Sequence, residues 1–83
     1  MDYKLIVPIT NVKGEKIEAV TVKESFTGRD IKAIGNAGGE GSAMIALVVA
    51  ATGLGENTVL NMDACDVREI GSMAKPFLAG GEG

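Results

Sequence analysis

The sequence predicts an α+β fold in which an N-terminal β-hairpin is followed by about four short helices. Apolar residues alternate along the first ten positions, as in a strand, and recur at helical spacing after position 27. An 83-residue chain makes one small domain. We expect the hairpin over residues 1–24, the helical part over 27–79 with a glycine-rich loop at 35–41, and a frayed tail over 80–83.

The first predicted strand has its apolar side chains on one face, at Tyr3, Leu5, Val7 and Ile9. Pro8 has no N–H to donate, so this strand should lie at an edge or become irregular there. Residues 11–14 form the turn, because Gly14 can adopt a positive φ.

The second predicted strand runs from about Glu15 to Lys23, and its apolar residues change face along it. Either a bulge lies near Ala19 or both faces are partly covered, and we favour the bulge. A two-stranded hairpin is marginal alone. It should therefore cover the helices or add strands from a neighbouring subunit through its open edges.

Residues 27–30, Thr-Gly-Arg-Asp, have the form of a capping box and begin the first helix. Ile31 and Ile34 share one face of this helix, which Gly35 and Asn36 end. We expect two to three turns at most.

The glycine-rich segment 35–41 must be tested as a phosphate-binding loop, because such loops can open a helix. The P-loop pattern requires Lys and then Ser or Thr after its last glycine, whereas Ser42 and Ala43 follow Gly41 here. Glu40 also places negative charge at the site. The sequence therefore favours a flexible linker.

The second predicted helix is apolar on every side, because residues 43–51 carry no polar side chain. Ser42 is the expected N-cap and Gly53 the expected left-handed residue after its end. It is too short to cross a bilayer, which takes ~20 apolar residues. One of its faces could meet the hairpin and the other the last helix, or one face could remain for a partner. Because so small a chain can hardly cover the whole helix, partner contacts are predicted at Met44, Ile45, Val48 and Val49.

A third helix is expected from Glu56 to Met62, with Val59 and Leu60 turned inward. Asp63 should cap the last helix, with Asp66 as the acidic partner of a capping box. The two carboxylates could also form a metal site or an acid–base pair, but capping explains both. Pro76 predicts a kink or an early stop in the last helix.

Composition narrows the classes of function. The chain has no histidine and one cysteine, Cys65, which argues against a disulfide, a thiolate–imidazole zinc site and histidine-dependent catalysis. The net charge is −3 and the basic residues are scattered. The sequence therefore shows no cluster of basic residues of the kind that binds nucleic acid. No hydrophobic signal core begins the chain. We expect a cytoplasmic, non-catalytic protein with no cofactor and no membrane partner.

The order of these features resembles the short tail assembly chaperones of Mu-like and related contractile-tailed phages and prophages. The matching segments are the strand Leu5–Ile9 with Pro8, Thr21-Val22-Lys23, Thr27-Gly28-Arg29-Asp30, Thr52-Gly53-Leu54, Leu60-Asn61-Met62-Asp63-Ala64-Cys65-Asp66 and the helix running to Phe77.

This resemblance implies no active site. It implies a chaperone of the bacterial host cytoplasm that binds the tape measure protein, the helical rod that sets tail length. Many copies would coat the rod, keep it soluble and help recruit tail-tube subunits, with weak homo-oligomerisation. Two alternatives stay open: a structural tail subunit that forms rings or tubes, and a small enzyme subunit that uses Asp63 and Asp66.

Overall fold

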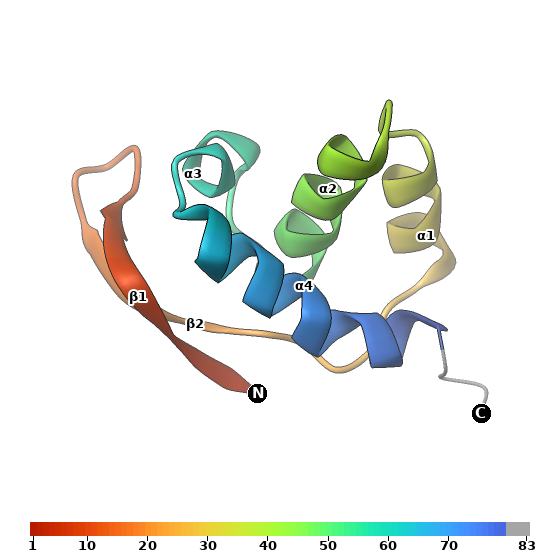
Figure 1. The fold of residues 1–83 in the computed structure, drawn as a ribbon, viewed down its shortest axis with the longest axis horizontal. Helices are drawn as coiled ribbons and strands as arrows, with labels where there is room; N and C mark the ends of the chain where they lie inside the picture. The colour runs from red at the N-terminus through yellow and green to blue at the C-terminus, as the bar shows by residue number, and fades with distance from the viewer. Residues whose placement is uncertain (80–83) are drawn as a thin grey trace.

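The computed structural model describes residues 1–79 and confirms the predicted α+β order, a hairpin followed by four helices (Figure 1). The expected frayed tail over 80–83 lies outside the described residues. The elements are β1 (Asp2–Thr10), β2 (Lys16–Thr21), α1 (Gly28–Gly35), α2 (Glu40–Thr52), α3 (Glu56–Leu60) and α4 (Ala64–Ala79).

The two strands pair antiparallel at their ends and separate in the middle. Lys4 pairs with Ala19 and Ile9 with Ile17, so that four residues of β1 face one residue of β2. This confirms the irregularity predicted near Ala19, but the surplus residues lie in β1, around Pro8. The surplus also turns Val7 outward, where it is 45% exposed, although strict alternation predicted it inside.

The hairpin lies against the helices. Leu5 and Ile9 of β1, Val20 of β2 and the following Val22 are buried in the core, and β1 contacts α4. The backbone N–H of Lys23 donates to the carbonyl of Ala51 at 2.9 Å, which ties the end of the hairpin to the end of α2. The hairpin therefore covers the helices; strand addition from a neighbouring subunit stays a prediction.

Figure 1 shows α1, α2 and α3 side by side, with α4 crossing in front of them. α2 contacts all three other helices, and its Leu47, Val48 and Ala51 are buried. The buried apolar residues form one cluster: Leu5, Ile9, Val20, Val22, Leu47, Val48, Ala51, Val59, Met62, Val67, Ile70 and Ala74.

α2 begins earlier than predicted. The helix starts at Glu40 and its N-cap is Gly39, not Ser42. Gly39 has a φ of 137°, which other residues rarely adopt, so the glycine supplies a sharp entry without a side-chain cap. The predicted end is confirmed: Gly53 is left-handed at φ 76°, and its N–H donates to the carbonyl of Val49 at 2.9 Å.

The last two helices correct two further predictions. α3 ends at Leu60, whose side chain is 56% exposed, whereas its neighbour Val59 is buried as expected. α3 buries Thr58 and Val59, and Leu60, about 100° further round the helix, therefore faces outward. α4 continues through Pro76 to Ala79, so the predicted early stop is wrong, and the kink that was the other predicted outcome stays a prediction. Pro76 has no N–H to donate to the carbonyl of Ser72, one helical turn earlier. Pro76 and Ser72 are both exposed, so water can donate to that carbonyl instead.

Candidate functional site

α2 places its four predicted contact residues in three different environments. Val48 is 0% exposed and belongs to the core, so it presents no surface to a partner in this structure. Met44, Ile45 and Val49 are partly buried and pack against the core with one side. α2 is apolar on every side, and the domain itself buries some of its faces. Val48 lies on one of these buried faces and is not open to a partner.

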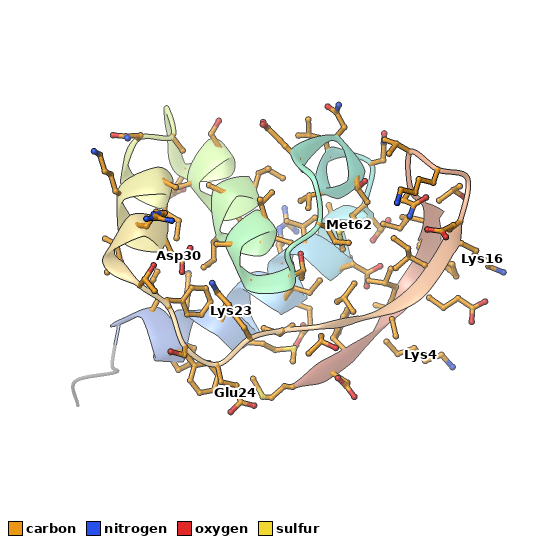
Figure 2. The ribbon with its side chains drawn as sticks, turned by 180° about the vertical axis from the view of Figure 1, so that it is seen from behind. Lys4, Lys16, Lys23, Glu24, Asp30 and Met62 are labelled. Atoms are coloured by element: carbon orange, nitrogen blue, oxygen red, sulfur yellow. The ribbon has the colours of Figure 1, made fainter. Side chains whose placement is uncertain are left out.

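Ile45 and Val49 form part of the floor of a groove between α1 and α3. We call it the α1–α3 groove; its volume is about 570 Å³. In Figure 2 α2 faces the viewer there, with no other described element in front of it. The lining residues are Arg29, Asp30, Ala33, Asn36 and Ala37 of α1 with its C-cap, Ser42, Ile45, Ala46, Val49 and Ala50 of α2, and Glu56 and Leu60 of α3.

The exposed Leu60 therefore has a place in the site. Because it forms part of the α3 wall, its side chain adds apolar surface to a groove whose floor is already apolar. Sequence periodicity assigned Leu60 to the core and so missed this role. No local sequence signal could have found it, because the residues around Leu60 do not show that α3 buries Thr58 and Val59 and leaves Leu60 outside.

The other wall, α1, packs on α2, with Ile34 against the core, and is capped at its N-terminal end. None of its eight residues, all of them described, is buried. The predicted capping box is confirmed: the Thr27 N–H donates to Asp30 Oδ2 at 3.0 Å, and the Asp30 N–H donates to Thr27 Oγ1 at 3.4 Å. Lys23 Nζ donates to the same carboxylate at 2.9 Å (Figure 2).

These contacts set the charge of Asp30. The Thr27 backbone hydrogen bond, followed by that from Lys23, lowers the pKa of the Asp30 carboxyl below its ordinary value. Lys23 also lies 5.0 Å from the centre of the Phe26 ring. The carboxylate at this end of the α1–α3 groove is therefore ionised and already occupied by partners of its own chain.

Met44 lies on another side of α2, in a groove shared with α4. This α2–α4 groove has a volume of about 480 Å³. Gly71 helps to shape it, because a Cβ there would lie 3.7 Å from Met44 Cγ. Its lining residues are Ile34, Glu40, Ala43, Met44, Leu47, Arg68, Gly71, Ser72, Lys75 and Leu78.

Asp66 does not complete a capping box; it joins α4 to the irregular part of β1. Its carboxylate is 0% exposed and accepts three hydrogen bonds. Tyr3 Oη donates to Oδ1 at 2.7 Å and the Ile6 N–H donates to Oδ1 at 2.9 Å. The Val7 N–H donates to Oδ2 at 3.1 Å. Ile6 and Val7 lie in the part of β1 that does not pair with β2. Their N–H groups therefore donate to the Asp66 carboxylate instead of to carbonyls of β2.

The pKa values follow from this arrangement. Burial by itself raises the pKa of Asp66, but the hydrogen bonds from Ile6, Tyr3 and Val7 outweigh it, and the pKa lies below its ordinary value. The hydrogen bond to Asp66, with burial, raises the pKa of Tyr3 to about 12. Asp66 is therefore a buried, ionised structural group.

Asp63 behaves as the sequence predicted. Its side chain accepts a hydrogen bond from the Cys65 N–H at 3.0 Å in the first turn of α4. Neither Asp63 nor Asp66 lines the α1–α3 groove or the α2–α4 groove. Nowhere in the described chain do three or more acidic, cysteine or histidine side chains gather into a set that could hold a metal ion. Among residues 1–79, no helix has both the length and the apolar character that crossing a bilayer requires.

The sequence matches the model of a known protein family. A family model described as "Phage tail assembly chaperone proteins, E, or 41 or 14" matches residues 2–79. No curated protein and no solved structure matches the chain. The match covers nearly the whole sequence and confirms the resemblance found in the order of its motifs.

Proposed function

Because the chain belongs to the phage tail assembly chaperone family, we propose that it binds the tape measure protein and keeps it soluble in the host cytoplasm. In the same proposal it helps to recruit tail-tube subunits. Its action is binding without catalysis, and no cofactor takes part.

The observation that carries this proposal is the α1–α3 groove. Its floor is Ile45, Ala46, Val49 and Ala50, and Leu60 adds an apolar wall. An amphipathic helix binds to such a groove through apolar residues three and four positions apart. A tape measure protein is a long helical rod with apolar stripes, so its segments have the form that this groove accepts.

A small groove gives modest affinity at any single position, because ordering the partner opposes the gain from burial. A rod offers many such positions in sequence. If several copies bind one rod and also contact each other weakly, the effective concentration at each site rises and the coat is retained. This is why we propose weak homo-oligomerisation on the substrate.

Co-expression with the tape measure protein tests the proposal, with a matched pair of variants. Leu60 and Ile31 are helical residues that are 56% and 55% exposed, but only Leu60 lines the groove. Leu60→Glu should therefore release the tape measure protein into the insoluble fraction, and Ile31→Glu should leave it soluble. Both variants should keep near wild-type stability, because exposed substitutions usually change it by under ~0.5 kcal/mol.

The affinity for a soluble tape measure fragment should fall about tenfold or more for Leu60→Glu, because burying a Leu is worth ~1.5–3 kcal/mol. If wild-type chain neither co-purifies with the tape measure protein nor raises its solubility, the proposal fails. Sedimentation of the isolated chain as a closed ring or tube would instead support a structural tail subunit.

A further inference from the structure

The α2–α4 groove has a charge pattern that the proposed function does not use. Its apolar surface includes Met44 and Leu47 of α2 and Leu78 of α4. Two basic residues of α4, Arg68 and Lys75, lie along the same groove. Both are exposed, and neither forms an ion pair with any other residue in the described part of the chain.

The spacing of the two cations is regular. They are seven residues apart in α4, which is two helical turns and about 10 Å along the axis. Between them lie the buried Gly71, which packs against Met44 and Leu47, and the exposed Ser72, whose small side chain leaves room for a partner to approach. The one acidic lining residue, Glu40, comes from the first turn of α2. In a chain of net charge −3, two unpaired cations beside an apolar strip form a local site of opposite sign.

We propose that the α2–α4 groove binds a second amphipathic helix, one whose apolar stripe is flanked by two carboxylates seven residues apart. The stripe packs on Met44, Leu47 and Leu78, and the carboxylates meet Arg68 and Lys75. Helices with acidic residues at this spacing present them on one face, so one helix can satisfy both cations at once. This site is separate from the α1–α3 groove and does not depend on what binds there.

A protein helix fits this groove better than a nucleic acid does. Phosphates could meet Arg68 and Lys75, but they would leave the apolar surface uncovered and would approach Glu40. A stripe flanked by carboxylates pairs both the apolar and the basic parts of the lining. Charge complementarity of this kind sets which partner is accepted more than it sets the total affinity.

The test uses two synthetic helical peptides of about 18 residues, long enough to form helix on binding. Both carry the same leucine stripe; one has two Glu seven residues apart beside it, and the other has Lys at those positions. Titration into isotopically labelled full-length chain, followed by NMR, should show the Glu peptide binding about tenfold more tightly. The shifted amides should include Gly71 and Ser72.

A charge-reversed double variant, Arg68→Glu with Lys75→Glu, should prefer the Lys peptide. The matched control is Lys4→Glu with Lys13→Glu, which makes the same change of net charge on the hairpin, where Lys4 points away from the helices (Figure 2). This control should keep the wild-type preference for the Glu peptide. Far-UV circular dichroism checks that both double variants fold.

Several results would overturn the inference. Equal affinity for the two peptides would show that Arg68 and Lys75 do not select the partner. Shifts confined to the Ile45 and Leu60 region would place the peptide in the α1–α3 groove. Shifts at Gly71 caused by a single-stranded oligonucleotide, or by raising the chain's own concentration, without peptide binding would assign the surface to nucleic acid or to a second copy. The Leu60→Glu result is independent of all of these.

Discussion

Replacing Asp66 by Ala should destabilise the fold by about 2–4 kcal/mol, although Asp66 lies outside both grooves. Its carboxylate is fully buried and accepts hydrogen bonds from Tyr3 Oη and from the N–H groups of Ile6 and Val7. A hydrogen bond to a charged group contributes ~1.5–3 kcal/mol, and the desolvation of the carboxylate offsets part of the sum. Ile6 and Val7 are exposed, so water can bond to their N–H groups after the substitution. The loss in free energy of unfolding is therefore moderate.

A graded series separates these contributions. Asp66→Asn can place its amide oxygen where Oδ1 accepts from Tyr3 and Ile6, so two of the three bonds survive. Its NH₂ group then faces the Val7 N–H, which loses its acceptor. We expect roughly half the loss caused by Ala. Tyr3→Phe removes one hydrogen bond to the charged carboxylate and should lower the free energy of unfolding by ~1.5–3 kcal/mol.

Urea denaturation followed by far-UV circular dichroism measures the series. A chain of this size has a total stability of about 4–12 kcal/mol, so the Ala variant should unfold at a clearly lower urea concentration. Asp63→Ala is the comparison, because it removes an ordinary helix cap worth ~1 kcal/mol. If Asp66→Ala lies within 0.5 kcal/mol of wild type (about the spread of neutral surface substitutions), the buried carboxylate does not hold β1 to α4 and our account of the hairpin is wrong.

Further predictions concern pH, backbone and groove. The pKa of Asp66 in the folded state lies below its ordinary value of 3.8, so stability should fall as pH drops below that value, and Asp66→Asn should flatten the acid limb of the stability curve. The pKa of Tyr3 is raised from 10.0 to about 12, so stability should also fall as pH rises through this interval, which a Tyr3→Phe variant would not show. Gly53→Ala should lower the free energy of unfolding, measured in urea, by ~1–2 kcal/mol, because Gly53 has a φ of 76°. Gly35→Ala should raise it by ~0.5 kcal/mol, because Gly35 lies in open space at the end of α1. Ala50→Leu should fill part of the α1–α3 groove; pull-down should then show weaker binding of the tape measure protein while the melting temperature is kept or raised.

Features fixed by neighbouring residues could be predicted from the sequence. The capping box at 27–30 and the left-handed Gly53 depend on residues within a few positions of each other, and both are confirmed. The order of strands and helices follows from apolar periodicity for the same reason. The bulge near Ala19 was visible as a change of face, although periodicity could not say which strand carries the surplus residues.

Features fixed by distant residues could not be predicted. Asp66 has the right spacing from Asp63 for a capping box, and nothing local shows that it bonds to β1 instead, more than fifty residues earlier in the chain. The burial of Val48 and the exposure of Leu60 depend on how α4 and α3 pack around α2. Because α2 is apolar on every side, its sequence alone cannot show which face stays open.

The contacts that α2 makes explain why open faces remain. α2 is apolar all round, and a helix of this kind needs a neighbour in every direction. Three helices and part of β2 contact it, and β1 packs on α4 and on β2. The α1–α3 groove and the α2–α4 groove are the directions that these neighbours leave open. Each open groove leaves apolar surface that a partner helix can cover. The charges beside each groove differ: Asp30 is paired by Lys23 and leaves Arg29 and Glu56 unpaired in the α1–α3 groove, whereas Arg68 and Lys75 are the unpaired cations of the α2–α4 groove among residues 1–79. These charges bear on which helix each groove accepts.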